Sequence, residues 1–318
     1  MERTGTLLAV RGLQVGHATD PLRRSGVTVI VFDDGVPTVV DARGGTTTAF
    51  DTSSLGLDAT FGRRHAVFFA GGSLYGLDAA RGVREWLVAS GAGRRAFGTP
   101  HPIVPLSGAA IFDLPHDGGP LPDYALLGRE AAEAVGRGRL ALGRVGAGAG
   151  ATVGKYLGRS AAMAGGVGSS SRSLGGRHHV GVLVVVNAAG AVRDPANGRW
   201  IAGARGPRGR LVPPTSLARR RLQGGGTTVA LVATDLPLPR PALARIASIA
   251  HAGLARAIVP YATSVDGDCV FAVTTSNAEP RLREAWPGAT ADFVGRLAAD
   301  AAVDAVLSAV RPIPRSSG

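Results

Sequence analysis

The sequence of 318 residues contains one cysteine, one lysine and few aromatic residues, which make up 5% of the chain. The lone Cys269 cannot form an internal disulfide and has no second cysteine with which to build a zinc site. No apolar run reaches the roughly 18 residues that span a bilayer, because Asn187 interrupts the longest candidate, residues 180–192. The N-terminal segment lacks the long apolar stretch of a secretion signal. These absences predict a cytoplasmic protein without a membrane anchor.

Glycine and small apolar residues are abundant instead. The chain has 47 glycines, 20 prolines and 45% hydrophobic residues, which is enough to build one large domain, 1–318. The formal net charge is +12, and residues 193–222 alone carry eight arginines against one aspartate. Only Trp200 could stack on a base in that stretch, so the charge predicts a solvated loop and no nucleic-acid partner.

Short β-branched and aromatic runs alternate with helical patterns along the chain. Leu243, Ile246, Ala250 and Leu254 follow one another at helical spacing, after Pro241 and before Pro260. The predicted strands are 27–32, 38–42, 66–70, 180–187, 227–235 and 269–275, and the predicted helices are 74–90, 241–259 and 291–310. Because these elements do not form a regular βαβ repeat, they predict a layered α+β architecture.

The sequence contains no complete motif of the kinds tested for a cofactor, a nucleophile elbow or a metal site. The glycine-rich segment 143–156 has Ala149 and Tyr156 where a phosphate-binding loop needs glycine and a hydroxyl residue. The segment 71–76 has Tyr75 where a nucleophile elbow needs glycine. The seven histidines contain no H-E-x-x-H pair. The sequence therefore predicts neither a cofactor nor a catalytic metal.

One segment combines a glycine-rich approach with an abrupt apolar strand: RRRLQGGGTTVALVATDLPLP, residues 219–239. It is open to two interpretations, a loop entering a core strand or a site of self-cleavage before Thr227. Cleavage after Gly226 would give Thr227 a free α-amine with a reference pKa of about 7.7 to 8. That amine could act as the base for the hydroxyl of the same residue. A glycine before the cut permits the strained backbone that an acyl shift requires.

The chain resembles the L-aminopeptidase/D-esterase and β-peptidyl aminopeptidase family of self-processing N-terminal nucleophile hydrolases, which includes 6-aminohexanoate-oligomer (nylon-oligomer) hydrolases. The resemblance covers roughly residues 15–310. It rests on the ordered motifs VGHATD, GVTVIVFDDG, VDARGGTTT, FFAGGSLYGLDAARGV, PIVP with IFD, GAGAGATVGK, VGVLVVVNAAG, TTVALVATD, HAGLARAIVP and DGDCVFAVTT. It implies a four-layer αββα sandwich of the N-terminal nucleophile type, with the connectivity that these aminopeptidases share with ornithine acetyltransferase.

The resemblance also implies a nucleophile and an oxyanion donor. Thr227 matches the family's nucleophile position, which is serine in one branch and threonine in the nylon-oligomer branch. Gly226 precedes the cut and would end a subunit of residues 1–226, while residues 227–318 would form the second subunit. Asn187 matches the family's asparagine whose side-chain NH₂ faces the oxyanion. From spacing alone Asn187 could also be an ordinary residue at a strand end.

Three further positions carry over from the nylon-oligomer branch. Asp266 and Asp268 match its Asp-Gly-Asp and would hold the Thr227 amine or hydroxyl and a substrate amine, with the Gly267 N–H assisting the oxyanion. Two carboxylates around one glycine could otherwise be a simple turn. Lys155 matches a lysine beside the nucleophile that would stabilise the alkoxide and orient the carboxylates. Phe112 stands where the aminopeptidase branch often has tyrosine, so it offers no hydroxyl.

The sequence thus predicts an autoprocessed amide hydrolase that acts on small peptides or amides with a free amino end. The site pattern shifts weight toward ω-amino acid oligomers, and the resemblance implies a homotetramer. Two alternatives stay open at this point: an acyltransferase of the ornithine acetyltransferase type, and an unprocessed scaffold without activity.

Overall fold

The protein is described by a computed structural model over residues 5–20, 22, 24–96, 98–115, 118–214, 225–278 and 288–311. Its centre is a nine-stranded sheet with the order β10-β11-β16-β18-β2-β4-β7-β3, and β1 pairs with β2 as well. These strands are β1 (Leu13–Asp20), β2 (Ser25–Ala42), β3 (Ala49–Phe50), β4 (Arg63–Ala70), β7 (Leu106–Ala110), β10 (Gly166–Gly175), β11 (His178–Asn187), β16 (Thr227–Thr234) and β18 (Cys269–Thr274).

The long strand β2 belongs to both halves of this sheet. Its first part, residues 27–31, pairs with β4, and its last part, residues 38–42, pairs with β18. The register with β4 shifts between Val31 and Val36, the pairing with β4 ends at Pro37, and the pairing with β18 begins at Thr38. The sheet therefore folds over, and its two halves lie face to face.

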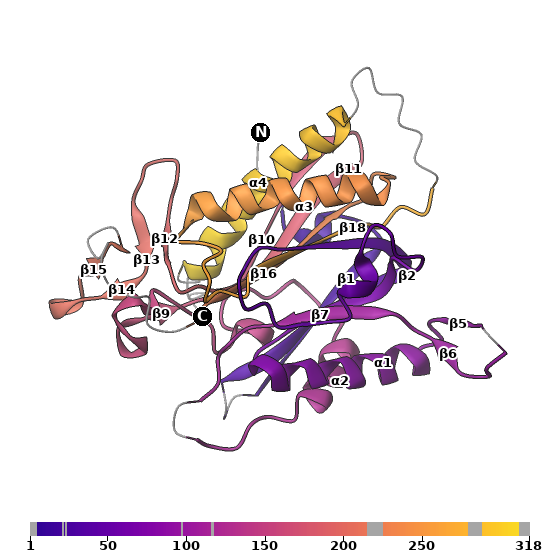
Figure 1. The fold of residues 1–318 in the computed structure, drawn as a ribbon, viewed down its shortest axis with the longest axis horizontal. Coiled ribbons are helices and arrows are strands. Elements are labelled where there is room, and N and C mark those ends of the chain that lie inside the picture. The colour runs from indigo at the N-terminus through magenta and orange to yellow at the C-terminus, as the bar shows by residue number, and fades with distance from the viewer. Residues whose placement is uncertain are drawn as a thin grey trace.

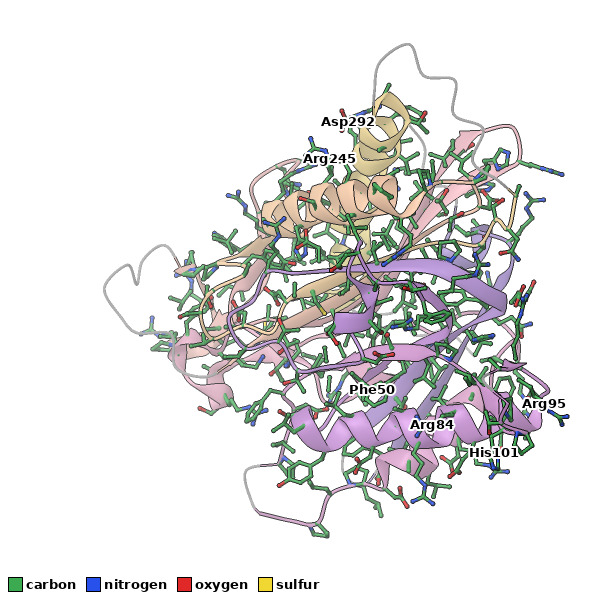
Figure 2. The ribbon with its side chains drawn as sticks, turned by 45° about the vertical axis from the view of Figure 1, so that its right-hand side comes forward. Phe50, Arg84, Arg95, His101, Arg245 and Asp292 are labelled. Atoms are coloured by element: carbon green, nitrogen blue, oxygen red, sulfur yellow. The ribbon has the colours of Figure 1, made fainter. Side chains whose placement is uncertain are left out.

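Helices cover the outer face of each half (Figure 1). The helices α1 (Ala79–Ala89) and α2 (Tyr124–Glu133) lie on one side, and α3 (Arg240–Ala257) and α4 (Ala289–Val310) lie on the other. Figure 2 shows the same two layers through their side chains: Arg245 and Asp292 meet across α3 and α4, whereas Arg84 lies on α1 at the opposite side. This is the predicted four-layer αββα sandwich.

Three apolar clusters fill the spaces between the layers. The central one lies between the two halves of the sheet, where the rings of Phe69 and Phe271 are 6.1 Å apart. A second packs α3 and α4 on the sheet, and a third packs α1 and α2 on the other half. Where α3 crosses α4, a side chain on Gly253 would lie 2.2 Å from the Ala299 carbonyl oxygen, so the close packing of the two helices requires glycine there.

The predicted elements are largely present, with three differences. The strands expected at 27–32 and 38–42 are parts of the single strand β2. The helix expected at 74–90 begins as a 3₁₀ segment, Ser73–Asp78, before α1. The basic stretch is not a plain loop up to residue 212, because its backbone pairs in short strands. The expected basic residues 219–221 lie outside the described residues.

The remaining strands are short and peripheral: β5 (Arg94–Arg95), β6 (Pro102–Ile103), β8 (Thr152–Val153), β9 (Met163–Ala164), β12 (Ala191–Arg193), β13 (Trp200–Ala202), β14 (Ala204–Arg205), β15 (Leu211–Val212) and β17 (Ile258–Val259).

Candidate active site

The antiparallel pairing of β11 and β16 brings two predicted site residues together. Asn187, the last residue of β11, lies opposite Thr227, the first residue of β16. β16 is buried along its whole length and β11 over its last eight residues, so their register is fixed by the core. Asn187 is fully buried and the Thr227 side chain is almost so. Polar groups at this depth need partners, and the surrounding segments supply them.

The bond between Gly226 and Thr227 lies among hydrogen-bond donors. Thr227 Oγ1 donates to the Gly226 carbonyl oxygen at 2.7 Å, and the Gly267 N–H donates to the same oxygen at 2.9 Å. Two donors on one carbonyl polarise it toward nucleophilic attack. A Cβ on Gly226 would lie 2.1 Å from the Ala189 nitrogen, so this backbone can occupy its place only as glycine.

The two aspartates lie on the other side of this bond and are held differently. Asp266 Oδ2 accepts from the Thr263 N–H at 2.9 Å and from Thr263 Oγ1 at 2.7 Å. Asp266 Oδ1 is buried without a hydrogen-bond partner among the described residues. It lies close to the bond between Gly226 and Thr227, since a Cβ on Gly226 would be 2.6 Å from it. An unpaired buried oxygen beside this bond is a place for a donor that the described residues do not supply.

Asp268 is fully occupied by backbone donors. Its Oδ1 accepts from the Thr228 N–H at 2.5 Å, and its Oδ2 accepts from the Ala262 N–H at 2.8 Å. Burial and the neighbouring charge of Asp266 raise the pKa of Asp268 to about 7, although both N–H groups act in the opposite direction. The carboxyl can therefore exchange a proton near neutral pH.

Lys155 contacts Asn187, the residue that lies opposite Thr227. Its buried ammonium donates to the Asn187 carbonyl oxygen at 2.7 Å, to the Thr152 carbonyl at 2.8 Å, to Asn187 Oδ1 at 2.9 Å and to the Ala188 carbonyl at 3.2 Å. Within the described part of the chain, its hydrogen bonds thus go to Asn187 and to backbone carbonyls. The lysine orients the amide of Asn187 rather than the two aspartates, which it reaches only through its charge.

Opposing effects act on the pKa of Lys155. Burial, followed by the nearby Arg159 guanidinium, lowers the pKa of Lys155 to about 7. The carboxylates of Asp266, Asp113 and Asp268 act in the opposite direction, in that order. The ammonium charge therefore depends on the surrounding carboxylates.

The side-chain amide of Asn187 has one possible orientation. Its Oδ1 accepts from Lys155 and from the Thr152 N–H at 3.0 Å, so the opposite end must be the NH₂ group. That group donates one N–H to the Phe112 carbonyl at 3.0 Å. Its second N–H makes no further hydrogen bond within the described residues.

Sequence reasoning missed two residues of this neighbourhood. Thr263 holds Asp266 as described above, and Asp113 is a buried carboxylate next to Phe112 in the chain. The signal for Asp113 was an acidic residue directly after a buried strand, inside the IFD motif. Such a residue was easily read as a loop residue, because its partners, Ser25 and Gly72, are far away in the sequence.

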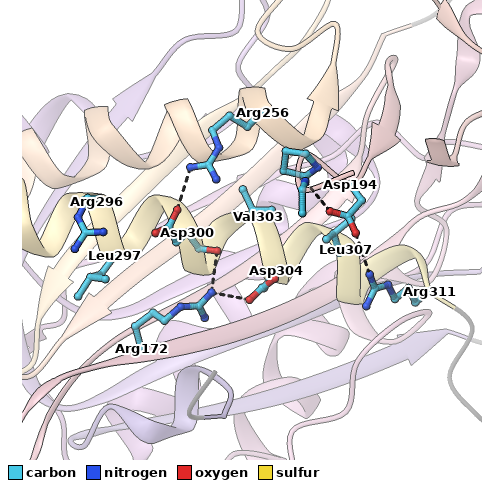
Figure 3. Close-up of a pocket in the computed structure, with 12 residues that line it drawn as sticks. Arg172, Asp194, Arg256, Arg296, Leu297, Asp300, Val303, Asp304, Leu307 and Arg311 are labelled. Atoms are coloured by element: carbon cyan, nitrogen blue, oxygen red, sulfur yellow. Dashed lines mark hydrogen bonds and ion pairs between the residues drawn. The ribbon is translucent and has the colours of Figure 1, made fainter. Parts of the chain in front are cut away.

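Two cavities of the described structure lie away from this site. One of about 500 Å³ runs along α4, where Asp304 pairs with Arg172 and Asp300 pairs with Arg256 (Figure 3). Another of about 380 Å³ surrounds Asp235 at the opposite end of β16. Neither is lined by Thr227, and the paired charges of the first are those of a structural ion-pair network.

Two further observations concern the whole described region. Its histidine, cysteine, aspartate and glutamate side chains form no group of three or more that could hold a metal ion. Every helix within the described ranges falls short of the length and apolar character that a membrane crossing needs.

Comparison with known proteins confirms the predicted resemblance. The family model of peptidase family S58 matches residues 6–312. An uncharacterised aminopeptidase of Mycobacterium bovis is 38% identical, covering 95% of this chain and 92% of its own. A 6-aminohexanoate-oligomer endohydrolase of Kocuria sp. is 31% identical, covering 94% and 84%.

Solved structures confirm the fold. The L-aminopeptidase D-Ala-esterase/amidase of Ochrobactrum anthropi, described as a variant of the N-terminal nucleophile hydrolase fold, matches with a TM-score of 0.69 at 24% identity, covering 96% of this chain and 85% of its own. A β-aminopeptidase of Burkholderia sp. matches with a TM-score of 0.63 at 24% identity, covering 96% and 86%.

Proposed function

Since the chain belongs to peptidase family S58 and is a hydrolase of amide bonds, we propose that it cuts itself between Gly226 and Thr227 and then uses Thr227 as its nucleophile. One observation carries this proposal. The Thr227 hydroxyl lies 2.7 Å from the Gly226 carbonyl oxygen, and the Gly267 N–H binds the same oxygen. The hydroxyl and the polarised carbonyl of an acyl shift are thus already side by side in the intact chain.

Self-cleavage then follows from these groups. Thr227 Oγ1 attacks the Gly226 carbonyl carbon while the Gly267 N–H stabilises the oxygen that becomes negative. The C–N bond breaks, the nitrogen takes the hydroxyl proton to become a free amine, and an ester links Gly226 to Thr227. Water hydrolyses this ester and leaves a carboxylate on Gly226. In proportion to 32.2 kDa for 318 residues, the two subunits would be about 23 and 9 kDa.

Turnover reuses the same machinery with the new amine as base. The α-amine of Thr227 takes the hydroxyl proton as Oγ1 attacks the substrate carbonyl, and it passes that proton to the leaving amine. The free N–H of Asn187 stabilises the oxyanion, an interaction worth about 3 kcal/mol in the transition state. Asp266 Oδ1, which lies beside Gly226 without a partner in the described residues, would bind the amine in its protonated form.

The substrates that fit this site are amides whose acyl part or end carries a positive amine. The buried groups around the bond include Asp266 and Asp268, whose negative charge attracts such an amine. The relatives named above are an aminopeptidase and a 6-aminohexanoate-oligomer endohydrolase, which supports peptides and ω-amino acid oligomers as two classes to test. The homotetramer and the cytoplasmic location stay predictions from the sequence.

The decisive experiment follows the backbone of the purified protein. Wild type is expected to give two bands, with N-terminal sequencing of the smaller one starting at Thr227. Thr227→Ala is expected to stay a single 318-residue chain without turnover. Thr234→Val, at the other end of the same strand, removes a threonine hydroxyl without touching the site and is expected to be cut normally. A Thr227→Ala variant that is still cut, or an active wild type that stays intact, would contradict the proposal.

An acceptor assay separates hydrolysis from acyl transfer. Incubation of the processed enzyme with an amide substrate and a second amine is expected to yield mainly the free acid. Dominant transfer to the amine would instead favour the acyltransferase alternative.

A further inference from the structure

A buried carboxylate outside the proposed catalytic set lies next to the oxyanion donor. Asp113 follows β7 and is 8% exposed. Its Oδ1 accepts from the Gly72 N–H at 2.6 Å, and its Oδ2 accepts from Ser25 Oγ at 3.0 Å. The Tyr124 hydroxyl lies 2.9 Å from the same Ser25 Oγ. One carboxylate therefore connects the ends of three elements, β2, β4 and β7, with α2.

The surrounding backbone is shaped around this carboxylate. A Cβ on Gly71 would lie 2.4 Å from Asp113 Oδ2 and 2.1 Å from Ser25 Oγ. A Cβ on Gly150 would lie 2.5 Å from the same Oδ2. Two chain segments can approach this closely only because both positions lack a side chain. Such close packing gives the carboxylate little freedom to move.

Two backbone segments connect Asp113 with the amide of Asn187. In its own segment, the preceding residue Phe112 accepts the Asn187 NH₂ on its carbonyl oxygen. In the segment that approaches its carboxylate at Gly150, the Thr152 N–H donates to Asn187 Oδ1. One end of this amide is thus held by the segment of Asp113 itself, and the other by a segment that packs on its carboxylate.

We propose that Asp113 is a positioning residue for the oxyanion donor: it fixes the backbone that holds both ends of the Asn187 amide and supports the charge of Lys155, the third group bound to that amide. This inference rests on the proposed function, in which the free N–H of Asn187 faces the reacting carbonyl. Asp113 itself does not touch the substrate.

The electrostatic part follows from the charges around Lys155. Those that face it are Arg159, which disfavours the ammonium, and the carboxylates of Asp266, Asp113 and Asp268, which favour it. Burial raises the pKa of Asp113 itself to about 6, so this carboxyl is charged at neutral pH. Removal of the Asp113 charge lowers the pKa of Lys155 further. Lys155 then loses its proton at a lower pH than in wild type, and its charged hydrogen bond to Asn187 Oδ1 is lost at the same pH.

The test is Asp113→Asn, which keeps the size of the side chain and removes its charge. Asp235→Asn is the matched control, because Asp235 is also buried and also accepts a backbone N–H, but at the far end of β16. On fully processed enzyme, kcat of Asp113→Asn is expected to fall about tenfold or more with KM within about twofold, since misplaced donors cost transition-state binding. The alkaline fall of kcat is expected at lower pH than in wild type. The control is expected to keep the wild-type kcat and pH profile.

Ser25→Ala tests the position of the Asp113 carboxylate separately from its charge. It also provides a test if Asp113→Asn does not fold or is not cut. It removes one donor to the carboxylate and keeps the negative charge. It is expected to lower kcat and to leave the alkaline fall of kcat where it is in wild type, because the Asp113 carboxylate stays charged at that pH. The inference is overturned if Asp113→Asn keeps wild-type kcat, if it loses no more than Asp235→Asn, or, where Asp113→Asn yields no processed enzyme, if Ser25→Ala keeps wild-type kcat.

Asn187→Ala distinguishes a failure of the role proposed for Asp113 from a failure of the proposed oxyanion donor. A large loss in Asn187→Ala together with a normal Asp113→Asn refutes only the role of Asp113. Wild-type turnover by Asn187→Ala refutes the oxyanion assignment in the proposed function, and the role of Asp113 falls with it.

Discussion

Gly226→Ala is expected to slow the proposed self-cleavage about 100-fold while leaving the fold intact. A methyl group at this position would lie 2.1 Å from the Ala189 nitrogen and 2.6 Å from Asp266 Oδ1. Favourable contacts between such atoms begin near 3.5 Å, so the backbone must move by on the order of 1 Å. The atoms that move include the carbonyl which Thr227 attacks. A misplacement of this size costs about 100-fold in rate, because attack requires aligned reacting atoms.

The neighbouring glycine provides the control. A methyl group on Gly225 would have its nearest contact, the Val265 carbonyl oxygen, at 3.2 Å, which a shift of a few tenths of an ångström relieves. Gly225→Ala is therefore expected to be cut at nearly the wild-type rate. The two alanine variants differ by one position along the chain and have the same helix and strand propensities. A difference between them must come from the site.

The assay is a time course of cleavage after cell-free synthesis with a labelled amino acid. The intact band and the band of about 23 kDa are quantified by gel electrophoresis, in proportion to 32.2 kDa for the whole chain. The expected order of rates is wild type, then Gly225→Ala close to it, then Gly226→Ala about 100-fold slower. Cleavage of Gly226→Ala at the wild-type rate would refute the reasoning, because it would show that the reacting carbonyl does not depend on this close approach.

Two further predictions concern the buried charges. Lys155→Met fills the same space without the ammonium that binds Asn187 Oδ1. The kcat of the processed variant is expected to fall about 100-fold, as for loss of an oxyanion donor. An unchanged kcat would contradict the assigned role of Lys155. The second prediction uses the uncut Thr227→Ala protein. In the folded, uncut chain the pKa of Asp268 is raised from 3.8 to about 7. Between these two pH values the folded chain binds more protons than the unfolded chain, so the free energy of unfolding falls as the pH rises. Thermal unfolding from pH 4 to 7 measures this, and Asp268→Asn in the same background is expected to flatten the dependence; an equal slope in both would refute it.

The elements that the sequence predicted best are those in which one physical rule dominates. The strand β16 is a short continuous buried run, and the helix α3 has buried apolar residues at the helical period. The strand β10 was not predicted, because it contains Ser169, Ser170 and Ser171, which read as a polar loop. These serines are buried, and Ser169 is satisfied by the Leu7 N–H and the Val182 carbonyl. Partners so distant in the sequence leave no local signal.

In the candidate site, too, some features have a signal in the sequence and others depend on distant partners. The resemblance located Thr227, Asn187 and the two aspartates, and the register of β11 and β16 explains how two of them meet. The role expected for Lys155 stays a prediction: its hydrogen bonds go to Asn187 and to backbone carbonyls, and it interacts with the aspartates through its charge. A motif gives the position of a lysine, but the direction of its ammonium depends on which carbonyls the fold brings to it.

The uncut chain has one unfavourable feature that the proposed cleavage would remove. Asp266 Oδ1 is buried without a hydrogen-bond partner in the described residues, and an unpaired buried acceptor costs about 1–3 kcal/mol. Its charge also opposes that of Asp268, whose pKa it helps to raise. Cleavage before Thr227 would create an ammonium group next to Gly226, close to Asp266 Oδ1. The event that would create the base for catalysis would thereby supply a partner for Asp266, so the chemistry and the electrostatics of the proposed reaction favour the same product.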